Sequence, residues 1–424
     1  MNFENSIDFA KQLDEEDPLR AYKNEFLFPE HGGKPVIYFT GNSLGLQPKT
    51  AQAKVQEVLN DWASLAVDGH FYAQNPWWEM HEQLSPKLAN IIGAKPKEVA
   101  IMNTLTANLH FLMVSFYKPT PHRYKIICEE KAFPSDQYAF QSQLRFHGYD
   151  PQDGIIELKK RKGTHHWYTE DVLETIEKNK DTATLLLMGG VNYYNGQVFD
   201  MQSITQKAKE CGLMVGWDLA HAVGNVKLEL HKWGVDFATW CSYKYLNSGP
   251  GSLAGIYVNE KYLDQSNLNR FEGWWGHDKA TRFQMQKNFK PMPNAEAWQL
   301  SNLPILSLAP QLASVQMFDD VGMGALVAKS QKLTNYLQYL LEHSQGFNRY
   351  FELLTPLKRG CQLSLYFKNK GREVFDAFSE HGVVADWREP GVIRLAPVPL
   401  YNSFEEMYLF AVILKNTLKQ VYTL

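Results

Sequence analysis

The stretch Val215–Gly255, VGWDLAHAVGNVKLELHKWGVDFATWCSYKYLNSGPGSLAG, decides the fold of this 424-residue chain. It contains two short apolar runs of the kind that form buried strands. The first run ends at the carboxylate Asp218, and the second, Val235–Trp240, is followed closely by Lys244. A glycine-rich turn comes next, with Gly249, Gly251 and Gly255. The stretch therefore predicts two successive strands of an α/β sheet, with a carboxylate and a lysine at their ends.

The order of this carboxylate and this lysine indicates pyridoxal phosphate (PLP) chemistry. A carboxylate at a strand end keeps the pyridine nitrogen of PLP protonated, and a lysine after the next strand forms the Schiff base. Taken singly, Asp218 and Lys244 are ordinary residues of a large α/β protein. His221, three residues after Asp218, has no evident partners for a metal, so no metal site is predicted.

Strands and helices alternate over more than a hundred residues before this stretch. The alternation predicts a mostly parallel sheet covered on both faces, whose active site lies at the carboxyl ends of the strands. Thr106, Phe133, Asp218 and Lys244 all fall at such ends. The predicted strands are Val99–Met102, Tyr124–Ile127, Ile155–Leu158, Thr184–Met188, Leu213–Trp217 and Val235–Trp240.

The pattern changes after Trp298 and predicts a second, α+β lobe. A long helical region covers Ile305–Ser344, and short strands and helices follow it. Earlier in the chain, one helix is expected at Trp78–Ile92. The expected domains are an N-terminal segment, 1–47, that packs with the small domain, a large PLP-binding domain, 48–304, and a small C-terminal α+β domain, 305–424.

Charge and cysteine usage restrict the class of protein. The net charge is −3, without a run of Lys or Arg that would suit a nucleic acid. The N-terminus lacks the hydrophobic core of a secretory signal, and no apolar stretch approaches the ~18 residues needed to span a bilayer. The four cysteines are scattered: Cys128, Cys211, Cys241 and Cys361. We expect reduced thiols in a cytoplasmic protein without membrane or nucleic-acid partners.

Three segments resemble the kynureninases, which are PLP enzymes of fold type I in the class-V aminotransferase family. The segments are TGNSLGLQPK at 40–49, AHAVGN at 220–225 and DFATWCSYKYLN at 236–247. The likeness extends from about Tyr38 to Phe404. It implies the hydrolysis of L-kynurenine, with or without a 3-hydroxyl group, to an anthranilate and L-alanine. It also implies a place in tryptophan catabolism or NAD biosynthesis.

The resemblance implies a set of cofactor contacts. Leu105 and Thr106, at the start of a helix, would bind the phosphate, and Phe133 would stack on the pyridine ring. From the residues alone, Thr106 reads as an ordinary helix cap and Phe133-Pro134-Ser135-Asp136 as the first turn of a helix. Gly189 lies where relatives can carry a small hydroxyl residue. The implied contacts are Leu105, Thr106, Phe133, Pro134, Ser135, Asp136, Asp218, His221, Tyr243, Lys244, Trp274 and Asn302.

Substrate contacts and proton transfer are implied in the same way. Arg394 lies inside an apolar strand, where an arginine needs a partner, and it resembles the arginine that binds the substrate α-carboxylate. Tyr194 and Tyr243 are both candidates for moving protons, and the choice between them stays open. The residues that match the pocket for the aromatic ketone are Asn42, Ser43, His70, Trp77 and Ser301.

Two other hypotheses remain open at this point. One is a desulfurase or aminotransferase of the same fold, for which Cys361 would be the nearest nucleophile. The other is a catalytically silent binding protein, although Lys244 is present.

Assembly is predicted from one segment of the chain. Phe271–Trp298 is rich in Trp, Gly and Pro and looks like an irregular loop, and Trp274 and Asn302 resemble residues donated by a partner subunit. A loop folded over its own subunit is the alternative. We expect a homodimer with shared active sites.

Overall fold

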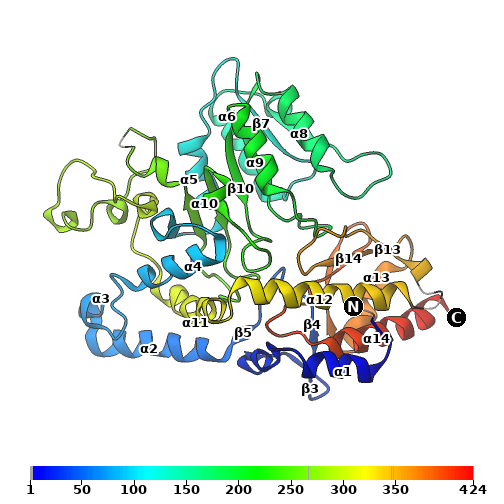
Figure 1. Cartoon of the computed structure of the whole chain (residues 1–424). Helices are drawn as coiled ribbons and strands as arrows, with labels where there is room; N and C mark the ends of the chain where they lie inside the picture. The colour runs from blue at the N-terminus through cyan, green and yellow to red at the C-terminus, as the bar shows by residue number, and fades with distance from the viewer. Residues whose placement is uncertain (1–2, 266, 345, 347, 424) are drawn as a thin grey trace.

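A seven-stranded sheet forms the centre of the larger lobe in the computed structural model, which describes residues 3–265, 267–344, 346 and 348–423 (Figure 1). Neighbouring strands are parallel, except that β12 is antiparallel to both of its neighbours. This arrangement confirms the α/β fold class. In sheet order the strands are β6 (Val99–Ile101), β12 (Gly255–Val258), β11 (Phe237–Trp240), β10 (Met214–Asp218), β9 (Ala183–Gly189), β7 (Lys125–Glu129) and β8 (Ile155–Leu158).

Strand β12 begins at the last glycine of the predicted turn and was not expected as a strand. A Cβ atom added at Gly255 would lie 2.1 Å from the indole ring of Trp240, which crosses this position from β11. Glycine therefore allows the close approach of two strands here, besides its usual role in turns. The glycine-rich sequence that ends at Gly255 predicted only a turn, whereas a strand of four buried residues begins there.

Helices pack on this sheet and bury its apolar side chains. Helix α5 (Leu105–Phe116) lies against β11, where Phe116 stacks on Phe237 with ring centroids 4.9 Å apart. Helices α8 (Thr169–Lys178) and α9 (Met201–Glu210) pack against each other, and α2 (Lys49–Leu65) packs along α11 (Ile305–Val321) below the sheet (Figure 1). The helices are α2 (Lys49–Leu65), α3 (Gly69–Tyr72), α4 (Ser85–Ile92), α5 (Leu105–Phe116), α6 (Pro134–Phe146), α7 (Pro151–Gly154), α8 (Thr169–Lys178), α9 (Met201–Glu210), α10 (Leu230–Trp233) and α11 (Ile305–Val321).

Two predicted helices are interrupted. The helix expected at Trp78–Ile92 is a 3-10 turn, Met80–Gln83, followed by α4, because a proline stands in the first turn of α4. The long helical region expected at Ile305–Ser344 is two helices, α11 and α12 (Met323–Glu342). Gly322 separates them with φ of 76°, a conformation that glycine adopts readily.

The smaller lobe has its own sheet and apolar core. Helices α12, α13 (Gly371–Glu380), α14 (Phe404–Tyr422) and the N-terminal α1 (Ile7–Glu15) pack around this core. Both chain ends lie on this lobe (Figure 1). Within the described residues its antiparallel strands are, in order, β13 (Glu352–Leu353), β14 (Leu363–Tyr366), β17 (Val392–Leu395) and β16 (Asp386–Arg388).

The N-terminal segment joins the two lobes. Strand β4 (Ile37–Tyr38) pairs with β15 (Val383–Val384) in the smaller lobe, and the N–H of Gly45 then donates to the Tyr243 carbonyl at 2.8 Å. Further short strand pairs are β1 (Phe26–Leu27) with β5 (Gln47–Pro48) and β2 (Glu30–His31) with β3 (Lys34–Pro35). The larger core includes residues beyond the expected boundary at 304, among them Leu326, Cys361 and Tyr401. The domain limits stay a prediction. None of the described helices is long and apolar enough to cross a membrane.

Candidate functional site

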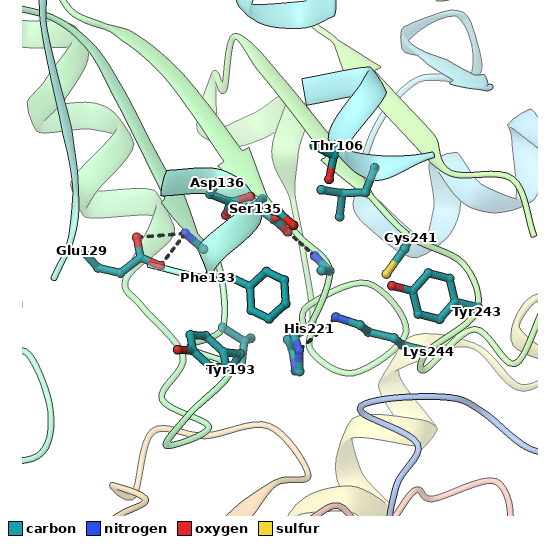
Figure 2. Close-up of a pocket in the computed structure, with 15 residues that line it drawn as sticks. Thr106, Glu129, Phe133, Ser135, Asp136, Tyr193, His221, Cys241, Tyr243 and Lys244 are labelled. Atoms are coloured by element: carbon teal, nitrogen blue, oxygen red, sulfur yellow. Dashed lines mark hydrogen bonds between the residues drawn. The ribbon is translucent and has the colours of Figure 1, made fainter. Parts of the chain in front are cut away.

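Lys244 and Asp218 meet at the carboxyl edge of the sheet, as the spacing predicted. Asp218 is the last residue of β10, and its Oδ1 accepts the N–H of Ala220 at 2.7 Å. Lys244 follows β11, and its Nζ lies 3.1 Å from Nε2 of His221 and 5.8 Å from the centroid of the Phe133 ring. These side chains surround one cavity (Figure 2).

The cavity collects most of the residues predicted to bind the cofactor. Pro134, the first residue of α6, is not part of the lining, although its neighbours are. Phe133 keeps 41% of its surface exposed, which leaves a ring face available for stacking. The lining consists of Leu105, Thr106, Glu129, Phe133, Ser135, Asp136, Gly189, Val191, Tyr193, Asp218, Ala220, His221, Cys241, Tyr243 and Lys244.

One end of the cavity is suited to a phosphate. Leu105 and Thr106 begin the first turn of α5. The side chain of Thr104, the residue before them, accepts no hydrogen bond from the N–H groups of this turn. The N-terminus of a helix carries a partial positive charge and N–H donors without helical acceptors. The Thr106 hydroxyl adds a further donor beside them (Figure 2). This end of the cavity therefore fits the phosphate of PLP.

The charges of the cavity suit a cationic ring. Burial raises the pKa of Asp218, and the Lys244 ammonium opposes that shift. Burial, followed by the charge of Asp218, raises the pKa of Asp136 well above its ordinary value. A protonated pyridine nitrogen would favour an ionised Asp218 in the same way as Lys244 does. Asp218 thus fits the ring nitrogen of PLP.

The side chains of His221 and Tyr243 are both neutral in this cavity. Burial, with Lys244 as the next cause, lowers the pKa of His221 well below its ordinary value. A neutral imidazole can accept a hydrogen bond from Lys244 through Nε2. Burial, followed by the nearby Cys241, raises the pKa of Tyr243, so its hydroxyl remains a proton donor.

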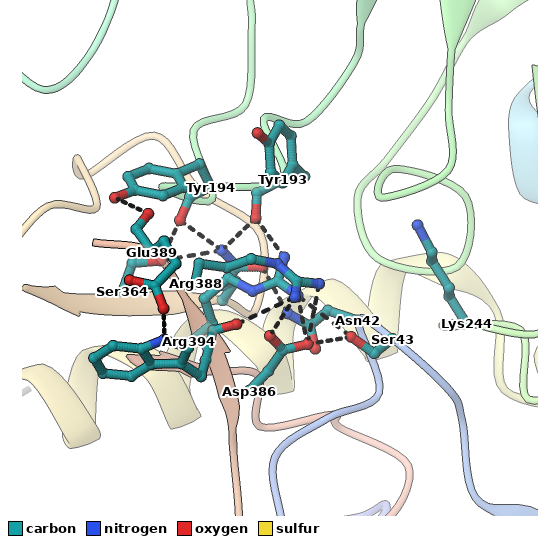
Figure 3. Close-up of polar contacts among 12 residues, drawn as sticks. Asn42, Ser43, Tyr193, Tyr194, Lys244, Ser364, Asp386, Arg388, Glu389 and Arg394 are labelled. Atoms are coloured by element: carbon teal, nitrogen blue, oxygen red, sulfur yellow. Dashed lines mark hydrogen bonds and ion pairs between the residues drawn. The ribbon is translucent and has the colours of Figure 1, made fainter. Parts of the chain in front are cut away.

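Tyr193 lines the cavity, and Tyr194 does not. The ring of Tyr193 meets Phe133 edge-on, with centroids 5.2 Å apart and planes at 83°. The hydroxyl of Tyr194 donates to the Glu389 carbonyl at 3.2 Å, on the side of the smaller lobe (Figure 3). Tyr193 and Tyr243 belong to the lining and Tyr194 does not. Which tyrosine handles protons stays a prediction.

Residues that the sequence analysis did not select also line the cavity. Glu129 is the last residue of β7, and a carboxylate at the end of an apolar run is the same signal that identified Asp218. Tyr193 could have been found only by knowing which way its side chain points. Cys241 follows β11 and lies beside Tyr243 (Figure 2).

A polar cluster between the lobes contains three of the predicted substrate residues (Figure 3). The guanidinium of Arg394 is 1% exposed and donates to Asp386 at 2.6 Å, to the Tyr193 carbonyl at 2.7 Å and to Ser43 at 3.3 Å. The Nε of Arg394 is buried without a partner among the described residues. Burial lowers the pKa of Arg394, and Asp386 opposes that effect. The unpartnered Nε–H is a donor suited to a carboxylate ligand.

Asn42, the third substrate residue of this cluster, donates to Gln362 at 2.9 Å. The remaining substrate and cofactor candidates lie outside the Lys244 cavity within one chain. His70 and Trp77 line a separate pocket with Pro304, and Trp274 lies in a third, 41% exposed. Ser301 and Asn302 are exposed.

Cys361 does not have the setting of a desulfurase nucleophile. Its side chain is fully buried, and burial raises the pKa of its thiol to about 12. Its N–H donates to Asn225 at 2.9 Å, which ties the backbone to the larger lobe. A catalytic thiol needs exposure and a lowered pKa.

Comparisons with known proteins identify the family of the chain. Residues 37–359 match the aminotransferase class-V family, and residues 326–414 match the kynureninase C-terminal domain. Among curated relatives, kynureninase of Flavobacterium psychrophilum is 60% identical over 98% of this chain and 99% of its own length. Kynureninase of Nematostella vectensis is 46% identical over 98% of this chain and 95% of its own length.

Solved structures share the fold at low sequence identity. The cysteine desulfurase CsdA of Escherichia coli superposes with a TM-score of 0.76 at 14% identity, covering 96% of this chain and 98% of its own. The cysteine desulfurase of Thermococcus onnurineus gives 0.73 at 17% identity, with 97% and 98% covered. The sequence relatives, by contrast, align over nearly their whole length at high identity. The chain therefore belongs to the kynureninase family, within the PLP-dependent class-V aminotransferases.

Proposed function

We propose that this protein hydrolyses L-kynurenine, and also its 3-hydroxylated form, to the corresponding anthranilate and L-alanine. One observation carries the proposal: a buried arginine whose Nε has no partner among the described residues donates to the carbonyl of Tyr193, which lines the cavity that contains Lys244 and Asp218. An amino-acid substrate needs both features, a cation for its carboxylate and a lysine that can exchange with its amine. The family membership supports the same reaction.

The proposed roles begin with the cofactor. PLP bound through Lys244 supplies an electron sink for the charge that develops on the substrate. Asp218 holds the proton on the ring nitrogen, and the first turn of α5, with Thr106, binds the phosphate. Phe133 stacks on the ring. Lys244, once released by the substrate amine, takes the α-proton at its Nζ, and the neutral His221 stabilises Lys244 through Nε2.

Substrate binding and protonation fall to the other residues. Arg394 binds the α-carboxylate, while Asp386 and the Tyr193 carbonyl hold its guanidinium in place. Tyr243, whose hydroxyl stays protonated, donates a proton at its phenol oxygen to the alanine-derived carbon after the carbon–carbon bond breaks. Asn42, Ser43, His70, Trp77 and Ser301 form the pocket for the aromatic ketone.

Five of the predicted contacts require a second subunit. His70, Trp77, Trp274, Ser301 and Asn302 lie outside the Lys244 cavity of their own chain, and Trp274 and Asn302 are exposed. We propose a two-fold homodimer in which these residues complete the partner's site. Mixing Lys244→Ala chains with Trp274→Ala/Asn302→Ala chains tests this, because a hybrid dimer regains one intact site. Absence of recovered activity after verified subunit exchange would contradict it.

The proposed activity is tested with purified protein, PLP and L-kynurenine. We expect release of fluorescent anthranilate and equimolar L-alanine, with none from Lys244→Ala. A folded, PLP-loaded protein that releases no anthranilate would refute the proposal. The ratio of kcat/KM for the two substrates then decides which of them is preferred. A cytoplasmic location is part of the proposal and can be tested by cell fractionation.

A further inference from the structure

Glu129 is a buried carboxyl group in the cofactor cavity to which no role has been given so far. It ends β7 and is 3% exposed. Both of its carboxylate oxygens accept one donor, the N–H of Gly189, at 3.2 and 3.3 Å. Figure 2 shows this pair of contacts on the side of Phe133 opposite to Tyr243. Glu129 thus faces the same cavity as Asp218 and Lys244.

No cation pairs with Glu129 in the described part of the chain. Burial raises its pKa to about 7, and the charge of Asp218 adds to that effect while Lys160 opposes it. A carboxylate buried without a cation is costly, so such a group takes up a proton more readily until a cation lies near it. The ionisable groups that face Glu129 are Asp218 on β10, Asp136 on α6, Tyr193 after β9, Lys160 after β8 and Cys128 on its own strand.

Gly189 explains how the carboxyl group fits there. It is the last residue of β9 and lies in register with Asp218, so it separates β7 from β10 at the edge of the cavity. A Cβ atom added at this position would lie 3.0 Å from Oε1 of Glu129, which is closer than an ordinary contact. The missing side chain therefore leaves space that the Glu129 carboxyl group uses.

We propose that Glu129 is a positioning residue of the cofactor cavity: together with Asp218 it provides the negative charge that holds the protonated ring of PLP. The proposal rests on the PLP binding included in the proposed function. The cationic ring supplies the charge that Glu129 lacks in its own chain, so Glu129 ionises when the cofactor binds. Two unit charges about 10 Å apart, at an effective dielectric constant of about 20, shift a pKa by about one unit.

The test compares Glu129→Gln with Glu130→Gln. Glu130 is the next residue and is a matched control, because it faces Lys159 and Lys160 outside the cavity, at 3.3 and 3.4 Å. Apoprotein is titrated with PLP to obtain Kd, and the visible absorption of the bound cofactor is titrated with pH. For Glu129→Gln we expect a Kd for PLP about tenfold higher than that of the wild type. We also expect the pKa obtained from the pH titration of the cofactor's absorption, the absorption pKa, to be about one unit lower. Glu130→Gln should match the wild type in both measurements.

Two further variants separate charge from packing. Glu129→Asp keeps the charge and should retain an absorption pKa close to that of the wild type, even where it binds PLP less tightly. The added methyl group of Gly189→Ala pushes against Oε1 of Glu129 and should lower the absorption pKa of the otherwise wild-type protein. The same substitution should not lower it further in Glu129→Gln, because the two residues act as one unit.

Three results would overturn the inference about Glu129. If folded Glu129→Gln binds PLP with the wild-type Kd and absorption pKa, the inference is overturned. An equal effect of Glu130→Gln, or a loss of the shift in Glu129→Asp as large as in Glu129→Gln, also overturns it. If the wild type itself binds no PLP, the proposed function fails first, and the two failures are therefore distinguishable.

Discussion

Replacement of Arg394 by lysine should weaken substrate binding far more than it slows turnover. The guanidinium makes three contacts, to Asp386, to the Tyr193 carbonyl and to Ser43, and its Nε–H has no partner among the described residues. A lysine ammonium can keep the pairing with Asp386, so that no buried carboxylate is left alone. It lacks the separate Nε–H donor that the guanidinium keeps for a second carboxylate.

The expected size follows from the lost contact. A hydrogen bond to a charged group contributes about 1.5–3 kcal/mol, which corresponds to a roughly 10- to 100-fold higher KM for L-kynurenine. The value of kcat should fall much less, because the carboxylate is held similarly in the ground state and in the transition state. Initial rates of anthranilate release over a range of substrate concentrations measure both constants.

A surface variant controls for the substitution itself. Arg372 lies exposed on α13, paired with Asp376 at 3.0 Å, and Arg372→Lys should leave both constants unchanged. A KM for Arg394→Lys within twofold of the wild type would refute the assignment. A loss confined to kcat would refute it as well, since that pattern belongs to a residue that acts only in the transition state.

Three further outcomes are expected. Lys244→Ala should bind PLP only reversibly, so that borohydride attaches no cofactor to the protein, as mass spectrometry would show. Gly216→Ala places a Cβ 2.3 Å from the Phe237 ring and should lower the free energy of unfolding by about 1–3 kcal/mol in urea, whereas Gly324→Ala, in open space within a helix, should raise it by about 0.5–1 kcal/mol. In the cofactor-free protein the pKa of Glu129 rises from 4.5 to about 7, so the folded state binds more protons than the unfolded state and stability falls as pH rises through this window. Urea unfolding at pH 5 and pH 8 should show Glu129→Gln gaining up to about 3 kcal/mol over the wild type at the higher pH.

Much of the fold and the centre of the site follow from local sequence. Alternation of apolar strands with helices determines a mostly parallel sheet, because each element must bury one face or stripe. The position of Asp218 at the end of one run and Lys244 after the next places both at the same edge, since the carboxyl ends of parallel strands coincide. The N-terminal turn of α5 follows from the same alternation.

The tertiary structure decided what depends on contacts between distant residues. Tyr193 and Tyr194 are adjacent, and only the packing of the two lobes determines that the first ring faces Phe133 and the second faces Glu389. The partners of Arg394 come from segments separated by as many as 351 residues. Sheet order likewise places Glu129 beside Gly189, through strands that are 60 residues apart. Local periodicity carries no information on such pairs, because register and lobe packing arise only when the whole chain has folded.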